Sequence, residues 1–164
     1  MITVAAALIQ QDGRLLICQR RRTDAFPLKW EFPGGKARAG ESPAEALARE
    51  LAEELGVVAK IGDEVYRTWH RYAEHPDELE LVFFFVELPP SSSAGAPDAN
   101  RPRNLAFERI EWAEPGALPQ YDFLPRTRNS FPCFRAGRCG CRRYGRMGSR
   151  LRLACVIVLS LVAR

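Results

Sequence analysis

Apolar runs of strand length open the chain. Residues 2–10 are almost entirely apolar, and residues 14–20 carry their apolar side chains at positions 15–18. Asp12 and Gly13 lie between the two runs, and an Asp-Gly pair is a strong signal for a tight hairpin turn. The pattern therefore predicts an antiparallel pair of strands at the start of the chain.

Further apolar runs predict strands along the rest of the body. They cover residues 57–61, 64–72, 79–88 and 109–112. The third contains an unbroken Val-Phe-Phe-Phe-Val segment, which is typical of a buried strand. Residues 91–104 are rich in Pro, Ser, Ala and Asn and predict an exposed loop, and residues 114–118 predict a helical turn. Together these elements indicate a mixed sheet.

One amphipathic helix interrupts this strand pattern. Ser42 is a natural N-cap, Pro43 suits the first helical position, and Glu45 completes a capping box. Gly56 provides a helix stop. Leucines at positions 47, 51 and 55 recur every four residues and form a stripe that can pack on the sheet.

A second face of this helix is acidic. Glu50, Glu53 and Glu54 stand at i, i+3 and i+4, so their like charges repel. Mg²⁺ would offset this repulsion, because it prefers carboxylates together with waters and phosphate oxygens. Arg49 precedes Glu53 by one turn and can orient it or pair with Glu41. The alternative is an ordinary solvated acidic face, and the glycine pair that precedes the helix favours the metal site.

The residues around this helix resemble a known signature. Residues 35–57 match every fixed position of the Nudix box, with Gly35, Glu41, Arg49-Glu50, Glu53-Glu54 and Gly56 in register. With the preceding Glu-Phe-Pro-Gly-Gly-Lys segment at 31–36, the chain looks most like the MutT branch of the Nudix hydrolases. The resemblance covers residues 1–125 and implies an α+β fold, an α/β/α sandwich with a mixed central sheet and the Nudix loop-helix.

The resemblance also implies the chemistry. Glu50, Glu53, Glu54 and the carbonyl of Gly34 would bind Mg²⁺ or Mn²⁺, and Arg49 would complete the catalytic group. Either Glu53 or Glu54 would act as general base. The expected reaction is the hydrolysis of a nucleoside triphosphate to the monophosphate and pyrophosphate, which in the case of an oxidised base such as that of 8-oxo-dGTP would sanitise the nucleotide pool.

Three residues are candidates for nucleotide contact. By the same resemblance, Arg20 falls where MutT-type enzymes contact the nucleotide, Phe32 lies beside the base, and Asp122 takes the place of a purine-reading Asn. An Asp side chain offers acceptors, or one donor when protonated, so it reads a base edge differently from an amide. The alternatives are a surface charge for Arg20 and a core position for Phe32.

The chain departs from the family pattern at one metal position. The family often has a further metal-binding glutamate about six residues before the strand tryptophan. Counted back from Trp112, that position is Ala106, and Glu108 is close but out of register. Either Glu108 substitutes for the missing carboxylate, or the helix carboxylates hold the metal alone.

The charge is divided unevenly along the chain. The formal net charge is +4, but residues 126–164 contain ten Arg and no acidic residue, which leaves the body at −6. The basic balance is therefore no argument for nucleic-acid binding, and we expect a small-molecule nucleotide as partner. The first residues lack the basic start of a signal peptide, which predicts a cytoplasmic protein.

The Arg- and Cys-rich tail, residues 126–164, does not continue the domain pattern. Three interpretations are open: a basic arm, a membrane-surface anchor, or a disordered or out-of-frame segment. The abrupt change of composition favours the last, a sequence read in the wrong reading frame from near Arg126. Its apolar run at 151–163 is shorter than the roughly 20 residues that span a bilayer, so no membrane insertion is expected.

Two other functions stay open from the sequence. The substrate would instead be ADP-ribose or another nucleoside diphosphate derivative, or the chain would be a nucleotide-binding module without catalysis. The retained carboxylates argue against the module. The sequence gives no indication of the oligomeric state.

Overall fold

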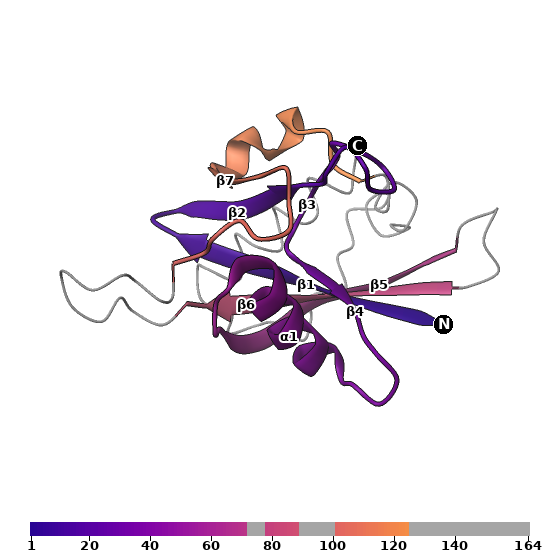
Figure 1. Cartoon of the computed structure of the whole chain (residues 1–164). Coiled ribbons are helices and arrows are strands. Elements are labelled where there is room, and N and C mark those ends of the chain that lie inside the picture. The colour runs from indigo at the N-terminus through magenta and orange to yellow at the C-terminus, as the bar shows by residue number, and fades with distance from the viewer. Residues whose placement is uncertain (72–77, 89–100, 125–164) are drawn as a thin grey trace, which may run out of the picture.

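A computed structural model describes residues 1–71, 78–88 and 101–124 (Figure 1). Its strands are β1 (Ile2–Gln11), β2 (Arg14–Gln19), β3 (Trp30–Glu31), β4 (Gly34–Lys36), β5 (Lys60–Arg71), β6 (Glu78–Glu87) and β7 (Arg109–Ala113). The helices are α1 (Pro43–Leu55) and the 3-10 helix η1 (Pro115–Gln120). None of the helices in these ranges is long and apolar enough to cross a membrane.

Strand β1 is the centre of a mixed sheet. It runs parallel to β6 and antiparallel to β4, while β5 pairs antiparallel with β6. At its far end β1 turns into β2 through Asp12 and Gly13, whose φ angles of 49° and 77° are those of a tight hairpin turn. Strand β2 then pairs with β3 and β7. The predicted hairpin and the mixed sheet are both confirmed.

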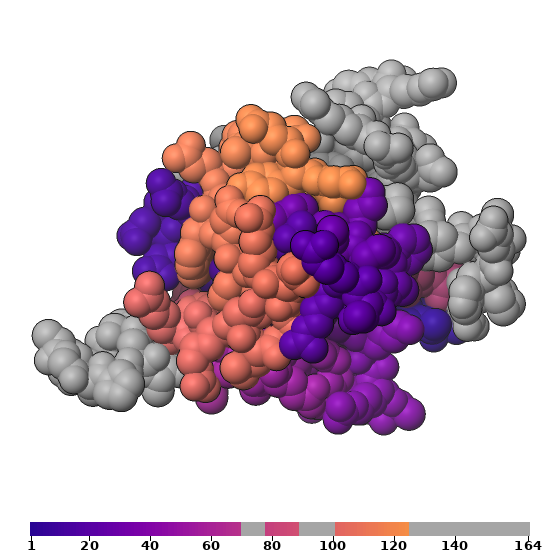
Figure 2. All heavy atoms as spheres, turned by 45° about the horizontal axis from the view of Figure 1, so that its top comes forward, coloured from indigo at the N-terminus to yellow at the C-terminus, as the bar shows by residue number. Residues whose placement is uncertain are grey.

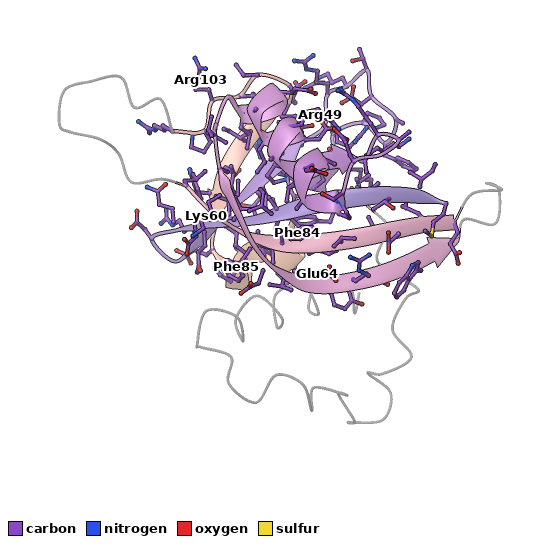
Figure 3. All side chains as sticks on the ribbon, turned by 90° about the horizontal axis from the view of Figure 1, so that it is seen from below. Arg49, Lys60, Glu64, Phe84, Phe85 and Arg103 are labelled. Carbon is purple, nitrogen blue, oxygen red and sulfur yellow. The ribbon has the colours of Figure 1, made fainter. Side chains whose placement is uncertain are left out.

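The alternation of side chains along β1 divides the core into two layers. Ala5, Ala7 and Ile9 belong to a cluster that also contains the three leucines of α1. The intervening residues of β1 belong to a second cluster on the opposite face, which contains Leu118 of η1 and is flanked by Tyr121 and Phe123. Figure 3 shows α1 on one side of β1, β5 and β6, with Arg49 on the helix. Helix α1 thus covers one face, and η1 with residues 121–124 lies on the other.

The helix has the predicted bounds because its signals are satisfied locally. The backbone N–H of Glu45 donates to Ser42 Oγ at 3.3 Å, and the Ser42 N–H donates to the Glu45 carboxylate at 2.8 Å. At the other end Gly56 takes a left-handed φ of 66°, and its N–H donates to the Ala52 carbonyl at 3.1 Å. Leu47, Leu51 and Leu55 are fully buried. The stripe therefore anchors α1 and fixes which way the acidic face points.

The structure corrects several boundaries. Strand β5 is continuous where two strands were expected, because register shifts between Ile61 and Tyr66 absorb the Gly62 interruption as a bulge. Strands β3 and β4 are two and three residues long, which is too short for a periodic signal. Most of the predicted 91–104 loop and all of the 126–164 tail lie outside the described residues, so the expectations for both stay predictions.

Candidate active site

A pair of glycines brings β4 against the acidic face of α1. Gly34 has a φ of 140°, and a Cβ on it would stand 2.2 Å from the Ala5 carbonyl oxygen. A Cβ on Gly35 would stand 2.5 Å from Cδ of Glu50. Position 34 admits only glycine because the clash is with backbone, whereas a side chain at position 35 would force the Glu50 carboxylate to move. The glycines therefore let the Glu50 carboxylate pack directly on the β4 backbone.

Arg49 is the hub of the carboxylate network. Its Nε and one terminal nitrogen donate to the two oxygens of Glu41 at 2.8 and 3.0 Å. The other terminal nitrogen donates to Glu50 at 2.8 Å and to Glu53 at 3.3 Å, and the Lys36 carbonyl accepts a further bond at 3.1 Å. The two alternatives predicted for Arg49, orienting Glu53 and pairing with Glu41, therefore occur together.

These contacts set the charge state of the hub. The bonds from Arg49, helped by the Arg38 N–H, lower the pKa of Glu41 to about 2. The same pairing, first with Glu41 and then with Glu50, raises the pKa of Arg49 above its already high ordinary value. Arg49 and Glu41 are thus a permanently charged pair at any physiological pH, which holds the end of the loop to the middle of the helix.

Glu54 stands in a different electrostatic environment. Burial raises the pKa of its carboxyl to about 8, and the nearby charges of Glu50 and Glu31 act in the same direction. The Gly34 N–H, which donates to Glu54 at 3.2 Å, and the charge of Arg20 oppose this shift without cancelling it. At neutral pH the Glu54 carboxyl is therefore protonated in the metal-free protein, and it would release that proton to bind a cation.

This donor set fits a hard divalent cation in chemistry. Carboxylate oxygens are the ligands such ions prefer, and a cation would stabilise the ionised form of a buried carboxyl such as that of Glu54. Within the described parts of the chain, however, no three Asp, Glu, His or Cys side chains converge on one point as a formed ion site. Glu50 and Glu53 are instead directed at Arg49. The carboxylates are gathered on one face, and cation binding would draw them away from the arginine.

Glu31 is a residue of this region that the sequence analysis did not single out. It pairs with Cys18 in the β2–β3 ladder, and both of its oxygens accept from the same nitrogen of Arg20, at 3.0 and 3.1 Å. Its charge also acts on Glu54. Glu31 begins the segment that contains the glycine pair, so its position in the sequence could have pointed to it. Only the glycines, however, had a physical reason to lie at a ligand site.

The predicted nucleotide contacts lie around β3. The Nε of Arg20 donates to the Ala25 carbonyl at 2.7 Å, so its guanidinium bridges that loop and Glu31. Phe32 is half-buried, with its ring centroid 5.6 Å from that of Phe123. Asp122 is held by a backbone bond from the Trp30 N–H and keeps 74% of its side chain exposed beside Lys29.

The structure also bears on the alternatives to nucleotide contact, a surface charge for Arg20 and a core position for Phe32. Arg20 is 20% exposed and paired with Glu31, so a nucleotide contact and a surface charge both stay open for it. Phe32 packs on the core cluster of β1 and β6 without being fully buried, which is compatible with either role. Whether these side chains contact a nucleotide stays a prediction.

Glu108 is paired away from the helix carboxylates. Its carboxylate accepts from the Nε of Arg22 at 3.1 Å, and its N–H donates to the Gln19 carbonyl at 2.9 Å. Figure 2 shows residues 101–124 packed beside the segment that follows β2. These contacts give no support to Glu108 as the substitute metal ligand, and that role stays a prediction.

Comparisons with known proteins agree with this geometry. The NUDIX domain profile matches residues 1–133. The chain is 40% identical over 87 residues to the 8-oxo-dGTP diphosphatase of Haemophilus influenzae, covering 52% of this chain and 62% of that protein. It is 31% identical over 134 residues to the nucleoside triphosphatase NudI of Escherichia fergusonii, covering 78% of this chain and 92% of that protein.

The CTP pyrophosphohydrolase of Escherichia coli is 48% identical over 65 residues, which are 40% of this chain and 48% of that protein. The chain thus spans about half to three fifths of the length of two of these curated relatives. Among solved structures, the E. coli ORF135 protein superposes with a TM-score of 0.61 at 31% identity, covering 77% of this chain and 82% of that one. The profile match and the NudI coverage together establish that the chain belongs to the Nudix hydrolase superfamily.

Proposed function

We propose that this chain hydrolyses a nucleoside triphosphate to the monophosphate and pyrophosphate in a reaction that depends on Mg²⁺ or Mn²⁺. The observation that carries the proposal is the gathering of carboxyl groups on one face of α1, where Glu50 packs on Gly35 and buried Glu54 accepts from the Gly34 N–H. The printed names of three relatives, an 8-oxo-dGTP diphosphatase, a CTP pyrophosphohydrolase and a nucleoside triphosphatase, support a triphosphate substrate.

The residues of the acidic face have distinct roles in this proposal. Glu50, Glu53, Glu54 and the Gly34 carbonyl would hold the cation. When bound, a divalent ion neutralises phosphate charge and lowers the pKa of a coordinated water. Arg49 keeps Glu41, Glu50 and Glu53 in one arrangement before substrate arrives. Glu53, whose side chain is 51% exposed, or Glu54 would take the proton of the attacking water.

The nucleobase of the substrate would lie on the side of the glycine pair that is away from the acidic face of α1. Phe32 and Phe123 present a half-buried aromatic surface there, and aromatic faces stack on nucleobases of any kind. The Asp122 carboxylate stands next to Phe123 and is 74% exposed; one of its oxygens accepts from Lys29, and the acceptor positions that remain would favour a base edge with N–H donors. Arg20, held by Glu31, would lie between this surface and the acidic face.

A pyrophosphate-release screen tests the proposal. The full chain would be assayed with the common ribo- and deoxyribonucleoside triphosphates, 8-oxo-dGTP and ADP-ribose, with Mg²⁺, with Mn²⁺ and with a chelator. For ADP-ribose, the release of AMP and ribose 5-phosphate would be followed. We expect metal-dependent turnover of at least one triphosphate. Turnover of ADP-ribose alone would favour the diphosphate-derivative alternative. No metal-dependent turnover of any compound would refute the enzyme and favour the binding module.

Two variants connect the screen to the site. Glu53→Gln removes one negative charge from the exposed end of the face and is expected to lower kcat by about 100-fold or more with an unchanged circular dichroism spectrum. Asp122→Ala is expected to change KM and the ranking of bases while kcat for the best substrate changes little. An Asp122→Ala variant with the wild-type base ranking would remove Asp122 from base recognition.

We also propose the location, the partner and the domain boundary that the sequence predicts. A cytoplasmic location, a small-molecule partner and the absence of nucleic-acid binding fit a nucleotide hydrolase. The domain boundary at residue 125 and the frame-error interpretation of the tail are tested by the intact mass of the expressed protein. A mass equal to that of all 164 residues would contradict the frame error.

A further inference from the structure

Arg38 stands at the outer end of the acidic face. Its guanidinium lies 3.4 Å from Oε1 of Glu53, and its side chain is 64% exposed. Glu53 is itself 51% exposed, whereas Glu50 is 18% exposed. The exposed end of the carboxylate face therefore has an arginine beside it that solvent, or a ligand, can reach.

The backbone that carries Arg38 is held firmly. The Glu41 N–H donates to the Arg38 carbonyl at 3.1 Å, and Gly40 has a φ of 84°, as the third position of a type II turn requires. The Arg38 N–H in turn donates to the Glu41 carboxylate at 2.8 Å. Because Arg49 binds the same carboxylate, the turn is tied to the helix. The Arg38 backbone is thus fixed by the turn, while its guanidinium is exposed to solvent.

The neighbouring cations are committed elsewhere. The N–H groups of Arg49 already donate to Glu41, Glu50, Glu53 and the Lys36 carbonyl, and its side chain is only 17% exposed. Lys36 lies directly opposite Val4 in the β1–β4 ladder, and Val4 belongs to the core cluster on the face away from α1. Since opposite residues of an antiparallel pair share a face, Lys36 projects away from the helix.

The N-terminus of α1 offers little to an anion either. Its capping box uses the Glu45 N–H for Ser42 Oγ and places the Glu45 carboxylate over the first turn. A phosphate approaching from this side would meet that negative charge. In this part of the described chain, Arg38 is therefore the cation best placed to receive a phosphate beside Glu53.

We propose that Arg38 binds the terminal γ-phosphate of the substrate and so selects triphosphates over diphosphates. The inference rests on the proposed function and concerns the same site. With the base near Phe32 and Asp122 and the cation held at Glu50, Glu53 and Glu54, the phosphate chain runs outward along the acidic face. Its γ-phosphate then reaches Glu53, where Arg38 replaces one carboxylate contact with a phosphate contact. A guanidinium suits this role because it donates to two phosphate oxygens at once.

The test compares full-length wild type, Arg38→Ala and Arg38→Lys. Each is assayed with the best triphosphate and the matching diphosphate at saturating Mg²⁺. Arg38→Ala is expected to lower kcat/KM for the triphosphate about tenfold, the effect of one charge-assisted contact, and to leave the diphosphate within about twofold. Arg38→Lys should recover part of the loss. Arg14→Ala is the matched control, because Arg14 is 55% exposed and paired only loosely, 3.7 Å from Glu114 at the hairpin.

Product inhibition gives a readout that altered folding would not imitate. Arg38→Ala should weaken inhibition by pyrophosphate about tenfold and leave inhibition by the nucleoside monophosphate unchanged. Equal losses for triphosphate and diphosphate, or for both products, would show that Arg38 acts only through Glu53 and would overturn the proposal. No change in any of them would overturn it as well.

The proposal stays testable if the proposed function fails. In that case wild type would hydrolyse no triphosphate, and calorimetric titration of magnesium pyrophosphate into wild type and Arg38→Ala would replace the kinetics. Binding that is about tenfold weaker in the variant would support Arg38 as a phosphate-binding residue. Equal affinities, or no binding to either protein, would refute it.

Discussion

The substitution Glu54→Gln should make the metal-free protein more stable at alkaline pH. Burial, with the charges of Glu50 and Glu31, raises the pKa of Glu54 from 4.5 to about 8. In the native state the carboxyl therefore keeps its proton up to about pH 8, while the unfolded chain releases it near 4.5. A glutamine has the shape of the protonated acid, and its oxygen can still accept from the Gly34 N–H.

The sign and size follow from proton linkage. Because the native state binds more protons than the unfolded state between pH 4.5 and 8, stability falls as pH rises through that window. Each unit of pKa difference corresponds to about 1.4 kcal/mol, so the ionisation of Glu54 removes at most about 5 kcal/mol by pH 9. Glu41 has the opposite sign, but its pKa is lowered to about 2, so its contribution is lost only in acid below this window.

Urea denaturation of full-length wild type, Glu54→Gln and Glu53→Gln in chelator, from pH 5 to pH 9, measures the effect. Wild type and Glu54→Gln should agree near pH 5 and diverge by several kcal/mol at pH 9. Glu53→Gln should follow the wild-type curve, because the Glu53 side chain is 51% exposed. Parallel curves for wild type and Glu54→Gln over the whole range would refute the placement of Glu54. Added Mg²⁺ at pH 8 should stabilise wild type more than Glu54→Gln.

Three further substitutions test the support of the site. Gly35→Ala puts a methyl group 2.5 Å from Cδ of Glu50 and should lower kcat about 100-fold, measured by pyrophosphate release. Leu51→Ala removes a fully buried side chain between α1 and the sheet and should cost about 2–5 kcal/mol of unfolding free energy in urea. Ser42→Ala breaks the capping box and should cost about 1 kcal/mol, with little change in KM; a loss as large as that of Leu51→Ala would contradict its role as a cap.

The helix and its acidic face could be predicted because their signals are local. Ser42, Glu45 and Gly56 contact groups within four residues along the chain, so the sequence spacing determines the geometry. The leucine stripe follows from helical periodicity in the same way. The hairpin at Asp12 and Gly13 is equally local. These elements carry most of the family signature, which explains why the family assignment needed no tertiary information.

The partners of the charged residues were harder to predict because they come from distant segments. Arg20 and Glu31 stand eleven residues apart and meet only through the β2–β3 ladder, which is too short for a strand pattern. Arg22 and Glu108 are separated by 86 residues. A sequence shows that such charges exist and gives no pairing, since pairing depends on strand register. The role expected for Glu108 was therefore the weakest of the metal predictions.

The placement of Arg49 explains how five acidic residues can share one side of a small domain. Arg49 shares its single positive charge among Glu41, Glu50 and Glu53, which reduces the repulsion between these carboxylates before any cation arrives. Arg20 compensates Glu31 in the same way. Glu54 instead accepts from the Gly34 N–H, and burial raises the pKa of its carboxyl to about 8. An incoming cation would therefore both displace the proton of Glu54 and compete with Arg49 for Glu50 and Glu53.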